Sequence, residues 1–516
     1  MRPEEAAINR GRALEPRPPL LGHARIALMG LLAALAALAI LSWLLLEFGH
    51  LYDRYNVNAV SGSLLALAER AREGVLYPPL FDGQSYGGTR TMPVPILLYA
   101  GAISVGGELL APAKFVDFLS SAVLVLVLVA VLRRLGAGVI LSLALASSVI
   151  ATQVFLLVGT GIRPESLPTA LQLGAVALVA FSSRRAAILF AAALCVVAIL
   201  SKFDALWAPV AIAVWLFARD RRSLLLFAVV FAAGTGASLV AFNIASGGRM
   251  FTNLFELGGA GISVGGVLRS PLKTVRLLLG DAQSSFALVP VVLLGLVFGT
   301  RRSRPTIFQI GLVVAVVIVL IAMADVGADY NHLLDLAVLL PIVAFEVTRD
   351  LAARFAEPQL AWSFLVVAVL AGSFAALAVN AGSDVAATLP GLTAAHTAAD
   401  NPRPLTAELS SARAVLSADP YVPLSLGERP VVTDAFMLLR IARRHPELVE
   451  PLQARIESRQ FDAIVLLEDL QLPTTVSWFS DGVFGLPIYQ AIENNYRFCS
   501  ATGGYYIYAP YSRPCP

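Results

Sequence analysis

Charged residues are scarce in this chain. Only 14% of its 516 residues are charged, whereas 57% are hydrophobic, and the mean hydropathy is +0.75. So little charge cannot cover the surface of a soluble domain, and the composition therefore excludes a soluble protein. The formal net charge is only +3, and nothing in it predicts a nucleic-acid partner.

Histidine and cysteine are also rare. The chain has five histidines and three cysteines, with no HExxH motif and no other metal-ligand spacing. It also lacks the GxxxxGK[ST] motif of phosphate-binding loops. We therefore expect no metal site and no cofactor.

What the chain has in abundance is apolar segments of helical length. We predict eleven membrane spans, although several are shorter than the roughly 20 residues that a perpendicular span needs. The first follows a basic N-terminal segment and has no small-residue cleavage site after it, which indicates a retained helix and not a signal peptide. The predicted spans are 26–47, 113–132, 137–158, 166–182, 186–201, 205–218, 223–243, 284–299, 306–325, 333–347 and 360–380.

Arginine clusters recur in every second connection between these segments. The positive-inside rule places the clusters and the N-terminus in the cytoplasm. The apolar piece 93–110 is broken by prolines and glycines, and counting it as a span would invert the later loops, so we interpret it as an interfacial helix. This predicts a multi-pass protein of the inner or plasma membrane with an extracytoplasmic C-terminus. The clusters are Arg133-Arg134, Arg184-Arg185, Arg219-Asp220-Arg221-Arg222 and Arg301-Arg302-Ser303-Arg304.

The predicted fold is an all-α polytopic membrane protein with a small C-terminal α/β domain. In the tail, apolar runs at 463–467 and 505–508 alternate with helical patterns at 435–444 and 451–459, which is typical of an α/β domain.

The chain divides into three predicted parts. They are a cytoplasmic segment, 1–24, a transmembrane domain, 25–380, and an extracytoplasmic domain, 381–516. The first outer loop, 48–112, contains an amphipathic helix near 60–72, and a Gly-rich outer loop covers 244–282.

Single polar residues gather in the connections at the outer face. Asp53 lies just beyond the first span, where a partly desolvated carboxylate suits proton transfer, and the alternative is a solvated aspartate or a helix cap. Arg163 offers a fork for phosphate oxygens, and Glu165 either pairs with it or binds a hydroxyl. The alternative for this turn is ordinary helix-start chemistry around Pro164 and Glu165.

Two further outer turns carry ionisable residues. Lys202-Phe203-Asp204 interrupts a hydrophobic hairpin, where Lys202 either has a function or extends toward the lipid headgroups. Asn331 and His332 precede a late span; His332 is a candidate base, while helix capping explains Asn331 equally well.

The order of these motifs resembles the C-type superfamily of membrane glycosyltransferases, which use polyprenyl-phosphate sugars. The resemblance covers most of residues 25–350. Two positions differ from the family pattern: Arg54 replaces the usual second acid, and Glu165 stands where Asp is usual. The matching residues are Asp53 with Asn56 or Asn58, Glu73-Gly74-Val75-Leu76-Tyr77-Pro78-Pro79, Thr91-Met92-Pro93-Val94-Pro95, Arg163-Pro164-Glu165, Lys202 and Asn331-His332.

The resemblance implies a metal-independent, inverting transfer of a hexose or pentose to an extracytoplasmic lipid, glycan or protein. Asp53 would activate or orient the acceptor hydroxyl, and Arg163 and Lys202 would stabilise the departing polyprenyl phosphate. Substrate contacts are expected from Tyr55, Asn56, Glu165, Asn331 and His332. The rival classes are a transporter or flippase for a lipid-linked substrate and a non-catalytic protein of envelope assembly.

The last two cysteines form a predicted disulfide. Cys499 and Cys515 both lie in the tail that the topology places outside, where disulfides persist, and Gly503-Gly504 between them suits a turn. The alternative is two free thiols.

Overall fold

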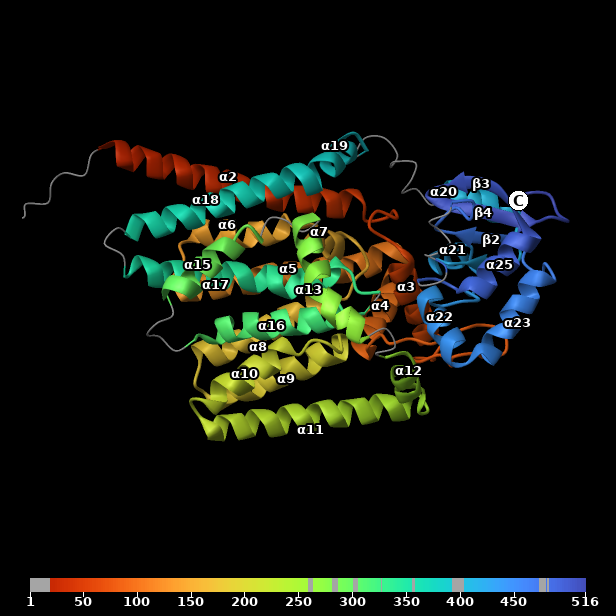
Figure 1. Ribbon diagram of the computed structural model, residues 1–516, viewed down its shortest axis with the longest axis horizontal. Helices are drawn as coiled ribbons and strands as arrows, with labels where there is room; N and C mark the ends of the chain where they lie inside the picture. Colours follow the sequence, from red (N-terminus) through yellow and green to blue (C-terminus); the bar gives the residue numbers. More distant parts are fainter. Residues whose placement is uncertain are drawn as a thin grey trace, which may run out of the picture.

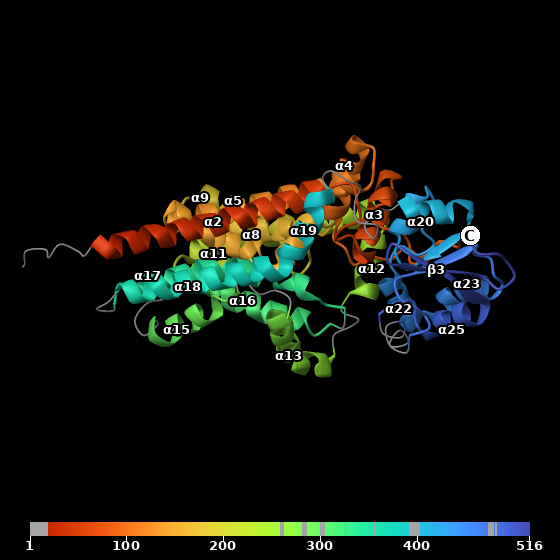
Figure 2. The ribbon, with the colours of Figure 1, turned by 90° about the horizontal axis from the view of Figure 1, so that it is seen from above.

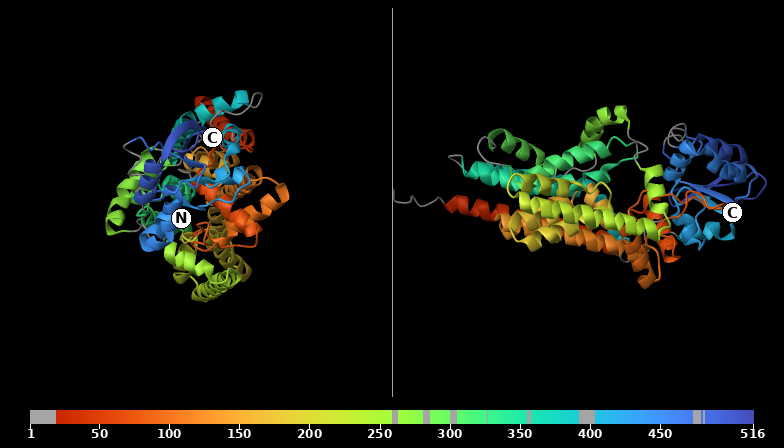
Figure 3. Two further views of the ribbon diagram at one scale, coloured as in Figure 1. Left: turned by 90° about the vertical axis from the view of Figure 1, so that its right-hand side faces the viewer. Right: turned by 90° about the horizontal axis from the view of Figure 1, so that it is seen from below.

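The computed structural model describes residues 19–258, 263–280, 286–299, 305–325, 327–354, 358–391, 403–472, 479 and 482–516. A bundle of long helices carries a small sheet domain at one end (Figure 1). The view from below shows the same arrangement (Figure 3, right). The connection between α10 and α11, which holds an arginine cluster, lies at the opposite end of the bundle (Figure 1).

The predicted apolar segments coincide with helices. Within the described residues, five helices are long and apolar enough to cross a membrane, or six if the bent pair α6 and α7 is one span. The protein is thus a mostly helical multi-span membrane protein, and eleven crossings stay a prediction. The helices are α2 (Pro19–Gly49), α5 (Leu110–Leu135), α6 (Val139–Ile150), α7 (Gln153–Thr160), α8 (Ser166–Phe181), α9 (Arg185–Ser201), α10 (Trp207–Phe217), α11 (Arg221–Ala245), α15 (Val289–Gly299), α16 (Ile307–Ala322), α17 (Leu334–Ala352) and α18 (Pro358–Ala376).

A sharp bend of 79° separates α6 from α7. Thr152 causes it locally, because this residue is extended and its hydroxyl accepts the Phe155 N–H at 3.2 Å, which starts a new helix. Helix α7 ends at Gly161, where a Cβ would approach the carbonyl oxygens of Asn56 and Leu157 to 2.6 and 2.7 Å. Only glycine fits there, and the chain then turns into the Arg163–Glu165 segment.

The first outer loop forms the two helices that the sequence predicts. Helix α3 (Ala59–Arg72) begins at Asn58, whose side chain accepts the N–H groups of Val60 and Ser61. Helix α4 (Pro93–Gly106) begins with proline, and Gly107 ends it in the left-handed region at φ +77°. Both helices lie between the bundle and the sheet domain (Figure 2).

The segment 244–282, predicted as a Gly-rich loop, contains two helices instead. They are α12 (Arg249–Leu257) and α13 (Val264–Gly280). Helix α12 buries Met250, Asn253 and Leu257, which share one face, so an amphipathic pattern outweighs the neighbouring glycines. The glycines before it form the turn from α11, at φ +63° and +84°.

The C-terminal part is a small mixed sheet with helices around it. Strand β1 runs parallel to β2, and β4 is antiparallel to both β2 and β3, in the order β1-β2-β4-β3. Every residue of β1 and β2 is buried, which agrees with the continuous apolar sequence of β2. The elements are α20 (Arg403–Glu408), η3 (Leu409–Ser411), β1 (Val415–Ser417), α21 (Tyr421–Ser425), α22 (Ala435–Arg444), α23 (Pro446–Glu457), β2 (Ala463–Leu466), α25 (Leu486–Asn495), β3 (Tyr496–Thr502) and β4 (Tyr505–Pro510).

A disulfide joins Cys499 of β3 to Cys515, with their Cα atoms 5.7 Å apart. It holds the end of the chain against the edge of the sheet. Three short elements remain: η1 (Tyr330–Leu333) before α17, and η2 (Leu377–Ala381) and α19 (Gly382–Gly391) after α18. Helix α19 packs against α2, and the sheet domain follows it in sequence.

Asp325 links the sheet domain to the bundle. Its carboxylate binds Arg90 of the first outer loop at 3.0 Å and Arg440 of α22 at 3.3 Å. Burial alone would raise the pKa of Asp325, but Arg90, the Gly327 N–H and Arg440 hold it below its ordinary range. Asp325 therefore stays charged and connects three separate parts of the fold.

Candidate active site

Asp53 lies in a buried polar network where α2 meets the first outer loop. One carboxylate oxygen contacts Nδ1 of His50 at 2.6 Å, and the other accepts the Tyr55 N–H at 2.9 Å. Lys114 of α5 approaches the second oxygen to 3.9 Å and donates to the carbonyls of His50 and Tyr55, both at 2.8 Å. Asp53 itself is 0% exposed, so it reaches a substrate only if one of these contacts is replaced.

Helix α19, which is distant in sequence but packs against α2, completes this network. Nε2 of His50 contacts the Thr388 hydroxyl at 2.8 Å, and the Tyr55 hydroxyl donates to Asp384 at 2.5 Å. The rings of His50 and Tyr55 stack with their centres 4.3 Å apart. Tyr55, predicted to contact substrate, is thus engaged inside the protein.

Asn56 connects the first outer loop to the second. It has φ +56°, which Asn tolerates better than most residues, and its side-chain amide donates to Thr160 at the end of α7 at 2.7 Å. The contact brings the Asp53 segment beside the turn that carries Arg163 and Glu165.

Arg163 and Glu165 are buried with polar atoms left free. Among the described residues, Nε of Arg163 and Oε2 of Glu165 have no hydrogen-bond partner, although these side chains are only 9% and 5% exposed. The other Glu165 oxygen accepts the Asn331 amide at 2.5 Å. Unpaired buried polar atoms are energetically unfavourable. A polar ligand that forms hydrogen bonds with these atoms would therefore bind favourably at this turn.

Asp117 of α5 positions that turn. It accepts the Arg163 N–H at 2.9 Å and the Tyr99 hydroxyl at 2.8 and 2.9 Å. The Arg163 backbone is therefore anchored to α5 and α4, while its guanidinium is left for other contacts.

Lys202, Asp204 and His332 form a cluster at the next two turns. Asp204 lies 3.2 Å from Nδ1 of His332 and 3.7 Å from Nζ of Lys202, and Lys202 lies 3.5 Å from the same Nδ1. Burial alone would raise the pKa of Asp204, but Lys202 and His332 hold it well below its ordinary range. Burial alone would lower the pKa of Lys202, but Asp204 and Glu165 raise it. Both groups are therefore charged near neutral pH.

The predicted residues thus fall into two groups. Asp53 and Tyr55 belong to the buried network, and Asn56 connects that network to the next turn. Glu165, Lys202, Asn331 and His332 come together, and Arg163 lies in the same turn as Glu165. The structure adds His50, Lys114, Asp117 and Asp384, which the sequence analysis missed. Lys114 and Asp117 had a signal, because two charges interrupt an otherwise apolar span. Asp384 had none, because it lies more than 300 residues from its partner.

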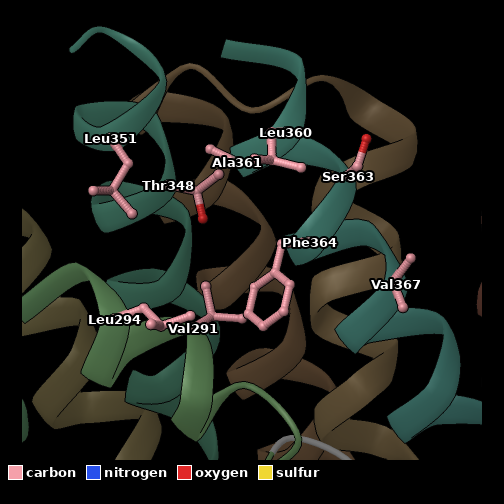
Figure 4. Close-up of a pocket in the computed structure, with 9 residues that line it drawn as sticks. All are labelled: Val291, Leu294, Thr348, Leu351, Leu360, Ala361, Ser363, Phe364 and Val367. Atoms are coloured by element: carbon pink, nitrogen blue, oxygen red, sulfur yellow. The ribbon is translucent and has the colours of Figure 1, made fainter. Parts of the chain in front are cut away.

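Two cavities lie away from these residues, and the smaller one is lined by Arg269, Lys273 and Asp325. One of about 480 Å³ lies between α15, α17 and α18, at the end of α17 away from η1 (Figure 4). Val291, Phe364 and Val367 are typical of its apolar lining. Within the described residues, no group of three or more His, Cys, Asp or Glu side chains is arranged to hold a metal ion.

Comparison of sequences finds no matching family model and no matching curated protein. Comparison of folds does find relatives. ArnT from Cupriavidus metallidurans, bound to undecaprenyl phosphate, matches with a TM-score of 0.55 at 14% identity, over 93% of this chain and 98% of that one. The oligosaccharyltransferase AglB from Archaeoglobus fulgidus, in complex with an inhibitory peptide and a dolichol-phosphate, matches with a TM-score of 0.52 at 12% identity, over 93% of this chain and 74% of that one.

These matches extend through both the helical bundle and the sheet domain, since they cover more than nine tenths of the chain. At such low identity they establish the fold. The chain has the fold of ArnT and AglB, and a fold of this kind is what the resemblance to the C-type membrane glycosyltransferases implied.

Proposed function

We propose that this protein is a membrane glycosyltransferase that moves a sugar from a polyprenyl-phosphate donor to an extracytoplasmic acceptor. The observation that carries the proposal is the free, buried Nε of Arg163, which has no hydrogen-bond partner among the described residues. It lies at the outer end of a fold whose relatives include a structure with bound undecaprenyl phosphate.

Arg163 and Lys202 suit a phosphate whose charge grows during the reaction. When the bond between the sugar and the phosphate breaks, the phosphate oxygens gain negative charge, and fixed cations stabilise that charge more than they stabilise the donor. Lys202 stays protonated because Asp204 and Glu165 raise its pKa. Glu165, with one free oxygen, is placed to accept a hydroxyl of the sugar.

The acceptor side of the reaction is assigned to the first outer loop. Asp53 is the carboxylate that the resemblance implies, to activate or orient the acceptor hydroxyl. Because Asp53 is buried, an acceptor can reach it only by displacing its contact with His50 or with Tyr55. Otherwise Asp53 orients the acceptor indirectly, by holding the first outer loop in place. We propose an inverting reaction without a metal. The acceptor is a lipid, a glycan or a protein.

Binding of undecaprenyl phosphate to the purified protein tests the phosphate site. Arg163→Ala and Lys202→Ala should each weaken binding about tenfold or more, because each removes a charge-assisted contact. Arg163→Lys keeps the charge but loses the planar fork, so it should also weaken binding. Arg72→Lys is the matched control, because Arg72 is partly exposed and pairs with Glu69 on α3.

Transfer of labelled sugar from undecaprenyl-phosphate hexose and pentose donors to membrane acceptors separates the rival classes. A glycosyltransferase forms a labelled product that stays after the lipid donor is removed. Movement of intact donor across the membrane without a product would instead establish a flippase. Unchanged binding in both Arg163→Ala and Lys202→Ala would disprove the phosphate site.

A further inference from the structure

Helix α13 leaves one apolar face uncovered. The helix packs against α16 and η1, and it runs across the long helices of the bundle on the outer side of α16 (Figures 1 and 2). Ser270 and Thr274 are buried on the face that packs. An exposed apolar face on such a helix is typical of a segment that lies along a membrane surface. The residues of this face, which are 47–81% exposed, are Val264, Leu268, Leu272, Val275 and Leu279.

A polar cavity of about 310 Å³ lies between α13 and the end of α16. Its volume falls within the range of roughly 300–1,000 Å³ that is usual for ligand pockets. Gly266 lets the two segments approach closely, because a Cβ at this position would collide with the Ala324 carbonyl oxygen. The polar side chains of the lining include Ser263, Arg269, Lys273 and Asp325.

The carboxylate in this cavity is already neutralised. Asp325 is the one acid that lines the cavity in the part of the chain that the structure describes. Its carboxylate binds Arg90 at 3.0 Å and Arg440 at 3.3 Å. Two cations therefore face one acid before the cations that line the cavity are counted.

Two further cations line the cavity itself. Arg269 is exposed and makes no hydrogen bond or ion pair with any residue that the structure describes. Lys273 donates to the carbonyls of Asp325 at 3.1 Å and Ala328 at 2.5 Å, and an ammonium has three N–H donors. Asp329 acts electrostatically on Lys273. Four cations thus stand against two carboxylates, and the cavity favours an anion.

Arg269 connects the cavity with the apolar face of α13. At about 3.6 residues per helical turn, its side chain projects between that of Leu272, on the apolar face, and that of Lys273, in the cavity. The planar guanidinium binds two phosphate oxygens at once. A lipid phosphate held by Arg269 therefore places the attached hydrocarbon chains against Leu268 and Leu272.

We propose that this cavity binds the phosphate group of an anionic phospholipid, whose hydrocarbon chains cover the apolar face of α13. Arg269 and Lys273 hold the phosphate. An anionic headgroup matches the excess of positive charge, whereas the choline group of a zwitterionic lipid is repelled by the same cations. Because Asp325 also joins the sheet domain to the bundle, the bound lipid links the position of that domain to the membrane surface.

This lipid is separate from the proposed sugar donor. Arg163 and Lys202, which we assign to the donor phosphate, do not line the cavity. The site therefore does not depend on the proposed function, and undecaprenyl phosphate binding should be unchanged in Arg269→Gln. A loss of undecaprenyl phosphate binding in that variant would assign the cavity to the donor and overturn the proposal.

Native mass spectrometry of the full-length protein tests the site. The purified protein in detergent is mixed with phosphatidylglycerol or with phosphatidylcholine of the same acyl chains, and it should retain phosphatidylglycerol more strongly. Arg269→Gln should weaken phosphatidylglycerol binding about tenfold, because it removes a charge-assisted contact with the phosphate. Arg269→Lys keeps the charge but loses the fork, so its binding should be intermediate.

Arg276→Gln is the matched control. Arg276 is exposed on the same helix about two turns after Arg269, and it does not line the cavity. The two arginines are separated by about 10 Å along the helix axis, a distance at which salt screens exposed charges. This variant should bind phosphatidylglycerol within about twofold of the original protein. Equal losses in Arg269→Gln and Arg276→Gln would reveal general surface attraction and overturn the site.

The apolar face is tested with inorganic phosphate as the second probe. A double variant, Leu268→Gln with Leu272→Gln, should weaken phosphatidylglycerol binding but leave any binding of inorganic phosphate unchanged, because only the lipid has chains to lose contact. Unchanged phosphatidylglycerol binding in this double variant would show that the cavity takes phosphate without the lipid, and would overturn the proposal. Unchanged phosphatidylglycerol binding in Arg269→Gln would overturn it as well.

Discussion

The guanidinium carbon of Arg54 lies 4.1 Å from the centre of the Tyr505 ring. Arg54 stands in the first outer loop, where the family pattern has a second acid, and Tyr505 belongs to β4 of the sheet domain. Arg54 also donates to the Gly503 carbonyl at 3.0 Å and is only 9% exposed. Arg54 therefore holds the sheet domain against the loop that carries Asp53.

Replacing Arg54 should loosen this docking. Arg54→Ala removes the ring contact and one hydrogen bond, which together contribute about 2–3 kcal/mol when they are shielded from water. Arg54→Glu should be worse, because Asp419 is bound to the Tyr505 hydroxyl at 2.6 Å and repels a new carboxylate. Thermal unfolding measures the effect. Equal stability of Arg54→Glu and the exposed-site control Arg413→Glu would contradict this docking.

Asp53 is expected to be essential for transfer. Asp53→Asn keeps the shape but weakens the contacts with His50 and Lys114, and transfer should fall by about the 10² to 10⁴ seen when a general base is lost. His50→Gln retains a donor toward Asp53 and should keep most of the activity. The assay is sugar transfer from undecaprenyl-phosphate donors at matched expression. Full activity of Asp53→Asn would remove Asp53 from the mechanism.

Acid should weaken the attachment of the sheet domain through Asp325. Because Arg90 and Arg440 hold the pKa of Asp325 below its ordinary value of about 4, its contribution is complete above that value. The contribution disappears as pH falls through the depressed pKa, since the native state must then be protonated. Asp325→Asn should lower stability by about 2 kcal/mol near neutral pH and remove this acid-dependent part.

Thermal unfolding in detergent from pH 7 to pH 3 measures the change. Glu69→Gln is the control, because Glu69 forms a partly exposed pair with Arg72 within α3. The Asp325→Asn variant should lose less stability between pH 5 and pH 3 than the original protein. An equal loss would show that Asp325 does not cause the acid-dependent loss of stability.

The sidedness of the membrane domain is testable by cysteine labelling in intact cells. Asp82→Cys in the first outer loop should react with a membrane-impermeant maleimide, whereas Arg184→Cys and Arg221→Cys should not, because the positive-inside rule places both arginines in the cytoplasm. The Cys499–Cys515 bridge agrees with an oxidising compartment for the sheet domain. Labelling of Arg221→Cys from outside would overturn the topology.

Local patterns in the sequence were sufficient to predict most helices and two strands of this fold. The apolar segments predicted the helices of the bundle, and alternating apolar runs predicted β2 and β4. The amphipathic pattern near 60–72 predicted α3, and the prolines at the start of 93–110 predicted α4. These signals are local, because hydrophobic period, capping and proline geometry act within a few residues. The prediction of a loop at 244–282 was wrong for the same reason. We gave the glycines more weight than the amphipathic pattern of α12, whose buried face packs against the first outer loop.

The sequence by itself determined that this chain is a multi-span membrane protein with polar residues at one face, since composition and loop charge depend on no partner. Only the tertiary structure decided how those residues combine. It enclosed Asp53 with Lys114 and with α19, and it joined Asp204 to His332 across 128 residues. It also left Nε of Arg163 without a partner in the part of the chain that the structure describes. Such pairings follow from how helices pack in three dimensions, and sequence separation carries no information about them.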